Sequence, residues 1–331
     1  MAEPRSPQLI TRLIDGRICS YALTADASGV LEPAAVFRPV AGDEAVGAAV
    51  SADLQRAVYA TLNAVVCVSG AGDALWRVAL DPYADEPHGH RPGCVLSRDG
   101  RVVWVYRPDA MAGRGGPDQW VALDAGTGAV VARTDLDTVG HGASQFLHPG
   151  DGSVLLDVGE GQDGSVIYRA TPGDDGAPAF DAYPWSDRCL IDLAPGGEQF
   201  MTVDHGQEDV AFHRYPDGEV LFALSVEAFG HDPDAVWTEW SGGYLTPDTA
   251  VVTLVGDGVR GKRDGDADAD GDGDGGDEAE EGYRCYLVDV RAGTVAGEFT
   301  AHARHSYDVQ PLGDGSWLTS DPSGHPVRRR A

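Results

Sequence analysis

The sequence has few of the residues from which a cationic surface is built. Its 331 residues include 24 lysines and arginines against 53 aspartates and glutamates, which gives a formal net charge of −29. Lys262 is the only lysine and Asn63 the only asparagine, a skew typical of a GC-rich bacterial genome. Because so acidic a chain repels phosphate groups over long range, nucleic acid and anionic membranes are not expected partners.

Cysteine is also scarce, and its placement argues against cross-linking. No two cysteines form a C-x-x-C pair, and an odd number cannot all pair with one another, so we expect neither a disulfide framework nor a zinc site. We expect small core residues in a reducing compartment. The five positions are Cys19, Cys67, Cys94, Cys189 and Cys285.

Long apolar runs and several catalytic motifs are missing as well. No stretch approaches the roughly 18 apolar residues of a membrane-spanning helix, and residues 1–16 contain no apolar run of signal-peptide length. We therefore expect a cytoplasmic protein. There is no G-x-S-x-G nucleophile motif and no glycine loop that cradles phosphate before a helix.

The chain is instead rich in turns: 44 glycines and 20 prolines punctuate short apolar runs. The stretch Gln119–Glu160 is representative, with four runs too short for helices separated by Asp-Ala-Gly-Thr-Gly, Gly-His-Gly and Pro-Gly-Asp-Gly. Glycine recurs where a tight reversal needs positive φ. This pattern predicts a four-stranded antiparallel unit.

The unit repeats with a period of roughly 45–50 residues, which is typical of a β-propeller. We predict an all-β, single-domain propeller over residues 1–331, with six blades favoured and seven possible, because runs at Gln8–Ile14 and Cys19–Tyr21 leave room for another blade. Pairing of N- and C-terminal strands is expected to close it. The expected first strands begin near Val46, Cys94, Gln145, Cys189, Trp237 and Tyr307.

Three Gly-His pairs and several third-strand sequences give the chain a likeness to a known family. The pairs end at His90, His141 and His231, and the strands read WRVALD, QWVALD and CYLVD. In these features the sequence resembles the WD-repeat propellers, although the Trp-Asp dipeptide itself is absent. The resemblance implies that each histidine binds an aspartate in a turn and fixes its blade, which is a structural role.

One inserted segment, residues 258–282, is almost entirely acidic and glycine-rich. Its spacing fits the calcium-loop pattern, with carboxylates on alternate residues and a closing glutamate. The flanks are strands where such a loop needs helices, and self-repulsion predicts a disordered loop. We therefore expect no cofactor, with calcium as a weak candidate. Its ligands would be Asp270, Asp272, Asp274 and Glu281.

Aromatic residues gather where the third, fourth and fifth predicted units meet. Such residues pack between blades, or they anchor a protein partner, because tryptophan and tyrosine dominate interface energetics. In the second interpretation the partner-binding residues are Tyr183, Trp185, Trp237, Trp240 and Tyr244.

Two functions fit these observations. The first is a non-catalytic, monomeric scaffold that binds a protein partner, with a basic partner favoured by the negative charge. The second is a small-molecule hydrolase or lactonase, or a ligand sensor, with a site in the central channel of the propeller. In that case Asp157, Asp192 and Asp204 are candidates for the channel lining.

Overall fold

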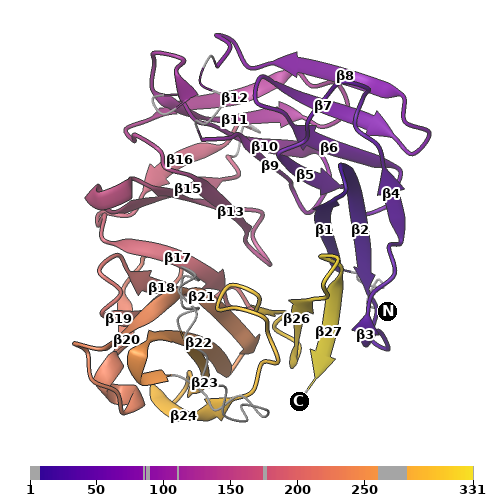
Figure 1. The fold of residues 1–331 in the computed structure, drawn as a ribbon. Helices are drawn as coiled ribbons and strands as arrows, with labels where there is room; N and C mark the ends of the chain where they lie inside the picture. The colour runs from indigo at the N-terminus through magenta and orange to yellow at the C-terminus, as the bar shows by residue number, and fades with distance from the viewer. Residues whose placement is uncertain are drawn as a thin grey trace, which may run out of the picture. The chain divides into compact units, whose positions relative to one another are not determined.

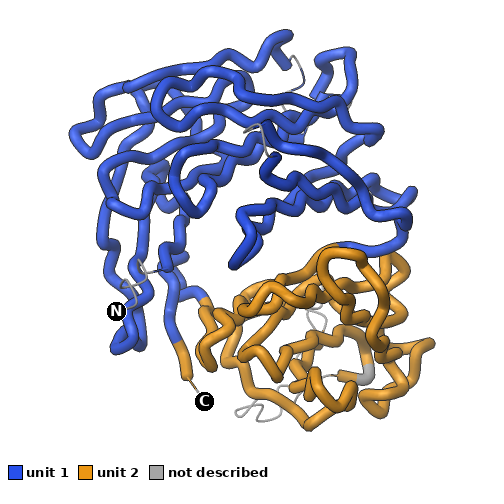
Figure 2. The backbone as a smooth tube through the Cα atoms, turned by 180° about the vertical axis from the view of Figure 1, so that it is seen from behind, with its two compact units in different colours: residues 1–189, 320–328 blue, residues 190–319, 329–331 orange. Residues whose placement is uncertain are grey.

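The computed structural model describes residues 8–84, 86, 90–109, 112–173, 177–259 and 282–330 (Figure 1). These residues form β-strands, turns and short 3₁₀ helices, among them η2 (Gly161–Asp163), η3 (Val226–Phe229) and η4 (Asp257–Val259). The chain divides into two compact units. Figure 2 colours the first, residues 1–189 with 320–328, blue and the second, residues 190–319 with 329–331, orange.

The first unit contains four antiparallel sheets, ordered β1-β2-β4, β5-β6-β7-β8, β9-β10-β11-β12 and β13-β14-β15-β16. The first strands of these sheets, β1, β5, β9 and β13, lie beside one another in that order. The strands are β1 (Gln8–Ile14), β2 (Arg17–Leu23), β4 (Ala35–Phe37), β5 (Gly47–Val50), β6 (Arg56–Ala60), β7 (Ala64–Ser69), β8 (Ala74–Ala79), β9 (Gly93–Leu96), β10 (Val102–Arg107), β11 (Asp118–Asp124), β12 (Val130–Leu136), β13 (Ala143–Leu147), β14 (Val154–Gly159), β15 (Ser165–Thr171) and β16 (Ala179–Ala182).

Two further four-stranded sheets, β17-β18-β19-β20 and β21-β22-β23-β24, belong to the second unit except for the first two residues of β17. Their strands are β17 (Arg188–Leu193), β18 (Gln199–Asp204), β19 (Asp209–Arg214), β20 (Val220–Ser225), β21 (Val236–Thr246), β22 (Thr249–Gly256), β23 (Tyr283–Asp289) and β24 (Thr294–Phe299).

The seventh sheet combines the two ends of the chain, in the order β25-β26-β27-β3. Its strands are β25 (Gln310–Pro311), β26 (Ser316–Ser320), β27 (Pro326–Arg330) and β3 (Gly29–Val30). Val327 pairs with Val30 and Arg328 with Gly29. The expected pairing of N- and C-terminal strands is therefore confirmed, and it places two residues of the β2–β4 connection at the outer edge of this sheet.

The fold is an all-β propeller of antiparallel blades, but it has seven blades where the sequence favoured six. The predicted first strands fall within a few residues of β5, β9, β13, β17, β21 and β25. The blade that a count of six leaves out is the sheet β1-β2-β4, whose strands β1 and β2 contain the runs Gln8–Ile14 and Cys19–Tyr21 that left room for a seventh. The strand β3, which joins the sheet β25-β26-β27-β3, has only two residues, and so short a strand leaves no periodic signal in the sequence.

Burial falls from the middle of each blade to its outer strand. Residues Ala250–Gly256 of β22 are all buried, because both faces of the strand pack against neighbouring elements. The outer strands β8 and β20 instead have no fully buried residue. In β8 and β20 exposed residues alternate with half-buried ones over most of the strand.

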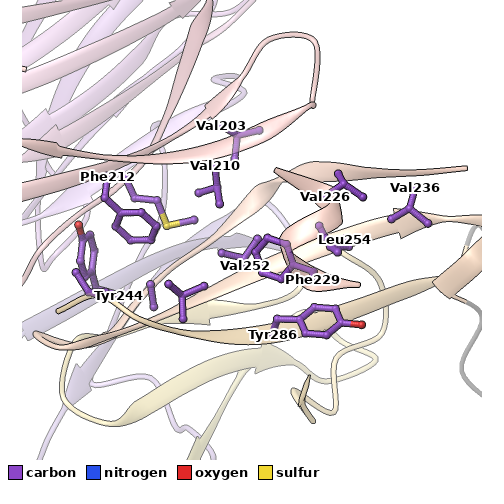
Figure 3. Close-up of a cluster of buried hydrophobic side chains, with 14 of the residues drawn as sticks. Val203, Val210, Phe212, Val226, Phe229, Val236, Tyr244, Val252, Leu254 and Tyr286 are labelled. Atoms are coloured by element: carbon purple, nitrogen blue, oxygen red, sulfur yellow. The ribbon is translucent and has the colours of Figure 1, made fainter. Parts of the chain in front are cut away.

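The largest core cluster of the second unit joins the β17–β20 sheet to the β21–β24 sheet (Figure 3). Phe212 of β19 stacks on Phe222 with ring centroids 4.5 Å apart and meets Tyr244 of β21 edge-on at 6.0 Å. Phe229 of η3 packs edge-on against Tyr286 of β23 at 5.4 Å. Burying each such ring contributes about 2–3 kcal/mol, so the sheets are held mainly by apolar packing.

The cysteines behave as the sequence predicts. All five are free thiols, four of them buried and Cys189 half-buried. Burial raises the pKa of Cys94 to about 12 and that of Cys285 to about 11, which keeps both thiols protonated at neutral pH.

Candidate interaction surface

Strand β21 is interrupted by a bulge that a pair of glycines makes possible. Thr238 pairs with Leu254 and Gly242 with Val252, so three residues, 239–241, face the single residue Thr253. Gly242 and Gly243 have φ values of +130° and +136°, which other residues rarely adopt. A Cβ on Gly242 would also overlap the carbonyl of Val251. The glycine pair thereby turns Glu239, Trp240 and Ser241 out of the regular ladder.

Glu239, the first residue of the bulge, has a carboxylate enclosed by neutral donors. Its Oε1 accepts the Tyr307 hydroxyl at 2.6 Å and the backbone N–H of Trp240 at 2.9 Å, while Oε2 accepts the Ser306 hydroxyl at 3.3 Å. The residue is 7% exposed. Ser241 Oγ donates to the Ser306 carbonyl at 2.9 Å, which fastens the segment before β25 to the bulge.

Two of the residues that donate to this carboxylate have large exposed aromatic side chains. Trp240 is 38% and Tyr307 56% exposed. The Trp240 indole N–H donates to the Asp204 carbonyl at 3.3 Å, and its ring lies 6.0 Å from the ring of His205. We call Glu239, Trp240, Ser241, Ser306, Tyr307 and His205 together the Glu239 site.

The loop between β18 and β19 is hydrogen-bonded to β21 at the start of the bulge. Gln207 has φ of +63°; its carbonyl accepts the Thr238 N–H at 2.8 Å and its side-chain amide donates to the Thr238 carbonyl at 3.0 Å. These two bonds hold the loop against the start of the bulge. In the part of the chain that the structure describes, no arginine, lysine or histidine forms an ion pair with Glu239.

Beyond the bulge, β21 meets a second enclosed carboxylate, that of Asp192 on β17. Its two oxygens accept the backbone N–H groups of Leu193 and Tyr244, each at 2.8 Å. Burial raises the pKa of Asp192 to about 7, against the lowering effect of these hydrogen bonds. A Cβ on Gly243 would lie 2.5 Å from Asp192 Oδ2, so only glycine admits this approach.

The five aromatic residues predicted to bind a partner have different environments. Tyr183 and Trp185 belong to the first unit, where their rings stack 5.0 Å apart and Arg169 lies 5.9 Å from the centre of the Tyr183 ring. In the second unit, Trp237 is half-buried and Trp240 is exposed. Tyr244 is fully buried in the core, so a partner has no access to its side chain. Sequence reasoning also missed Glu239 and Tyr307.

The Gly-His histidines do not make the contact that the WD-repeat resemblance implies. His231 Nε2 shares a 2.6 Å hydrogen bond with the Tyr286 hydroxyl, and burial lowers its pKa. The rings of His90 and His141 lie 5.2 Å apart. Within the described residues, no hydrogen bond from any of the three to an aspartate in a turn is present.

It is the glycine of the second Gly-His pair that contacts an aspartate. Asp118, at the start of β11, is fully buried. Its Oδ2 accepts the Gly140 N–H at 2.7 Å, the Thr138 hydroxyl at 2.9 Å and the Tyr106 hydroxyl at 3.0 Å, and its Oδ1 accepts the Asp109 N–H at 2.7 Å. A Cβ on Gly140 would overlap the Tyr106 hydroxyl. This aspartate fixes the end of the β9–β12 blade.

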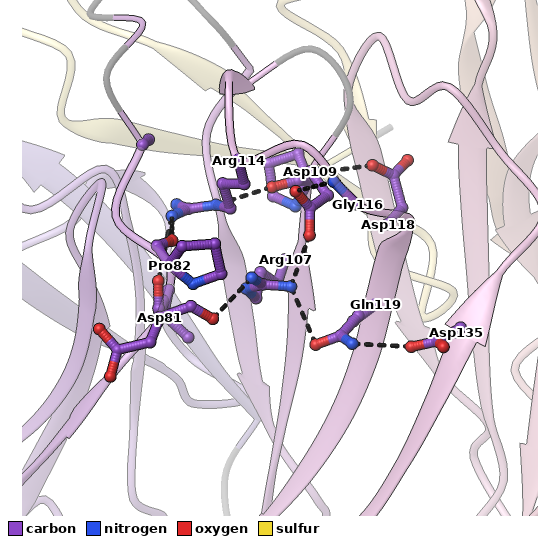
Figure 4. A network of polar contacts seen from close by, with 12 residues as sticks. Asp81, Pro82, Arg107, Asp109, Arg114, Gly116, Asp118, Gln119 and Asp135 are labelled. Atoms are coloured by element: carbon purple, nitrogen blue, oxygen red, sulfur yellow. Dashed lines mark hydrogen bonds and ion pairs between the residues drawn. The ribbon is translucent and has the colours of Figure 1, made fainter.

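Two buried arginines complete this polar cluster (Figure 4). Arg107 donates to Asp109 Oδ2 at 2.8 Å and to the Asp81 carbonyl at 2.7 Å. Arg114 also donates to Asn63 Oδ1 at 3.2 Å, which explains the single asparagine as an anchor in a turn. The backbone carbonyls that accept from Arg114 belong to Leu62, Leu80, Pro82 and Pro108. The cluster balances two arginines with two aspartates and ties the β9–β12 sheet to the β5–β8 sheet.

The proposed calcium ligands Asp270, Asp272, Asp274 and Glu281 lie outside the described residues, as does most of the inserted loop 258–282. Among the residues that the structure does describe, no group of three or more His, Cys, Asp or Glu side chains is placed to hold a metal ion. In the same part of the chain, no helix has the length and hydropathy that a membrane span requires.

Three solved structures are similar to this chain in fold. BamB from Moraxella catarrhalis matches at 14% identity with a TM-score of 0.50, over 100% of this chain and 96% of its own. The hydrazine synthase of Kuenenia stuttgartiensis matches at 13% identity with a TM-score of 0.51, over 85% of this chain and 74% of its own. The dihydro-heme d1 dehydrogenase NirN, in complex with DHE, matches at 13% identity with a TM-score of 0.52, over 100% of this chain and 64% of its own.

Likeness at this level of identity concerns the fold alone, and two of the three neighbours are named as enzymes. Comparison of the sequence with models of protein families and with curated proteins finds no match. The blades of the structure and its neighbours together identify the chain as a seven-bladed β-propeller.

Proposed function

We propose that this propeller is a non-catalytic interaction scaffold that binds a protein partner through the Glu239 site. The observation that supports this most is the joint exposure of Trp240 and Tyr307 around one enclosed carboxylate. Tryptophan and tyrosine supply most binding energy at protein interfaces, because they bury large areas at little entropic cost. The glycine-dependent bulge holds Trp240 on strand β21, and the hydrogen bond from the Tyr307 hydroxyl to Glu239 holds Tyr307 in the turn before β25. Both restraints limit the entropy that binding would remove.

The overall charge supports a basic partner. A net charge of −29 attracts cationic proteins over long range, and this attraction weakens as salt is added. The same field disfavours nucleic acid and anionic membranes. Cysteines that form no disulfide agree with a reducing, cytoplasmic location. Kinship with WD-repeat proteins and a monomeric state are further parts of this proposal.

Site-specific photo-crosslinking tests the proposal. The photoreactive residue p-benzoylphenylalanine replaces Tyr307 in one variant and Tyr83, which is 63% exposed in the first unit, in a matched control. In cells of the source organism we expect one discrete crosslinked protein at position 307 and none at position 83. The product should disappear when Trp240→Ala is added. Equal crosslinking at both positions, or a product that survives Trp240→Ala, would contradict the proposal.

A small-molecule hydrolase, a lactonase or a ligand sensor is the second candidate, and Asp192 is the observation that favours it. A carboxyl group with a pKa of about 7 can give or take a proton at neutral pH, which is the property of a general acid or base. A panel of lactone and ester substrates tests this function. Hydrolysis by the wild type that Asp192→Asn abolishes would support it over the scaffold.

A further inference from the structure

We propose that the Glu239 site receives the guanidinium group of an arginine from the partner protein. This inference rests on the proposed function and specifies the chemistry of recognition. It follows from three properties of the site: a carboxylate that is enclosed without a cation, two residues with exposed aromatic side chains that hydrogen-bond to it, and an incomplete set of hydrogen bonds.

The first property is the missing positive charge. Removing a carboxylate from water is costly unless a cation or strong hydrogen bonds compensate it. Asp109, which is equally buried, has Arg107 at 2.8 Å. Glu239 is 7% exposed and its described donors are two hydroxyl groups and one backbone N–H, all neutral. A cation brought by a partner would supply what the chain itself does not.

The second property is the pair of aromatic rings. A cation above the face of tryptophan or tyrosine is attracted by the ring quadrupole, and more strongly when partly desolvated. Trp240 and Tyr307 are both exposed, and both bind Glu239 Oε1, one through its backbone N–H and the other through its hydroxyl. Both exposed aromatic residues are therefore anchored on the carboxylate that a cation would bind. Guanidinium is planar and weakly hydrated, so it suits such a site better than the ammonium group of lysine.

The third property is the geometry of the remaining acceptor. A carboxylate oxygen accepts about two hydrogen bonds. Oε1 already has two, at 2.6 and 2.9 Å, whereas Oε2 has one long bond of 3.3 Å from Ser306. One position on Oε2 therefore stays available for an N–H donor. We expect a single charge-assisted hydrogen bond to Glu239, with the rest of the guanidinium stacked on an aromatic ring.

The test uses N-acetyl-argininamide as the probe and the full chain labelled with 5-fluorotryptophan. The chain has seven tryptophans, and Trp240→Phe identifies the fluorine resonance of Trp240. We expect this resonance to shift and saturate as the probe is added. N-acetyl-citrullinamide, which has the same shape without the charge, should shift it far less.

Two variants separate recognition by Glu239 from general electrostatics. Glu239→Gln keeps an acceptor for Tyr307 and removes the charge, and we expect it to weaken binding by about tenfold, the magnitude of one charge-assisted hydrogen bond. Glu208→Gln makes the same change of charge on an exposed residue of the β18–β19 loop and should weaken binding less than twofold. Circular dichroism and thermal unfolding of each variant show that it is folded.

The inference is overturned if citrulline and arginine probes act alike, if the probe leaves the Trp240 resonance unmoved, or if Glu239→Gln and Glu208→Gln weaken binding equally. These outcomes leave the proposed function separately testable. A crosslink at position 307 that Trp240→Ala removes and Glu239→Gln does not would keep the scaffold and reject arginine recognition.

Discussion

Asp118 and Glu239 are both acidic residues removed from water, and their surroundings differ in a way that separates structure from recognition. Asp118 lies in the first unit, fully buried, and accepts four hydrogen bonds within a cluster that also holds two arginines. Glu239 lies in the second unit, has three neutral donors and is bordered by exposed aromatic rings. The first arrangement is complete within the chain. The second needs a cation.

The comparison shows that burial alone does not identify a functional carboxylate. A satisfied, charge-balanced network rigidifies the fold, because removing any member leaves the others unpaired. An enclosed carboxylate that faces exposed aromatic rings is better suited to bind than to stabilise. Mutation should therefore lower stability at Asp118 and lower binding at Glu239.

The largest effect is expected for Asp118→Asn. The new amide would turn one N–H group toward the donors that now bind the carboxylate, so we expect a loss of about 3–5 kcal/mol in the free energy of unfolding. Asp99→Asn, in an exposed turn of the same sheet, is the control and should cost less than about 1 kcal/mol. Urea denaturation measures both, and equal losses would remove the contrast.

The next effect concerns the bulge on which Glu239 depends. Gly242→Ala places a Cβ against the Val251 carbonyl and holds alanine at φ of +130°, so we expect a loss of about 2–3 kcal/mol. Gly100→Ala has positive φ and open space around its Cβ, and should lose only about 1 kcal/mol. If the two variants lose the same amount of free energy of unfolding in urea denaturation, the bulge is not held by close packing around Gly242.

A smaller effect is expected from the titration of Asp192. Its pKa is about 7 in the folded protein and about 4 in the unfolded chain, so the folded state holds the proton longer as pH rises. The contribution of this group to stability is therefore present below pH 4 and is lost between about pH 4 and 7. We expect wild type to lose about 1–3 kcal/mol more than Asp192→Asn over this range. Parallel stability–pH curves would contradict the raised pKa.

The smallest effect on stability is expected at the interaction surface itself. Glu239→Gln preserves an acceptor for the Tyr307 hydroxyl, and the change should alter the free energy of unfolding by less than about 1 kcal/mol. Trp240→Ala, which truncates an exposed side chain, should fall in the same range. A loss as large as that of Asp118→Asn would mean that Glu239 is a structural residue too.

The propeller fold and the approximate positions of six first strands can be predicted from the sequence alone, because turn residues and the period of the four-stranded unit can be recognised along the chain. The sequence favours six blades and leaves seven possible, because the strand β3 that completes the terminal sheet has only two residues and pairs with a strand about 300 positions away. The roles of the Gly-His histidines depend on which side chain packs opposite, such as Tyr286 against His231, and this is not encoded locally.

The candidate site is only partly visible in the sequence. Trp240 is predicted from the clustering of aromatic residues, whereas Tyr244, four positions later, proves to be core. Two successive glycines within an apolar run, Gly242-Gly243, are a signal that could have predicted the bulge and drawn attention to Glu239. Tyr307 and Ser306 could not be associated with it, since they bind across 68 and 67 residues.

The most direct test of the contrast measures how much saturating N-acetyl-argininamide stabilises wild type and Glu239→Gln against unfolding, relative to equal N-acetyl-citrullinamide. Binding to the folded state alone must raise the free energy of unfolding by RT ln(1 + [L]/Kd). Our account predicts a rise of about 1 kcal/mol or more for wild type at tenfold excess over Kd, and a clearly smaller rise for Glu239→Gln. Equal stabilisation of the two proteins, or none in either, would contradict it.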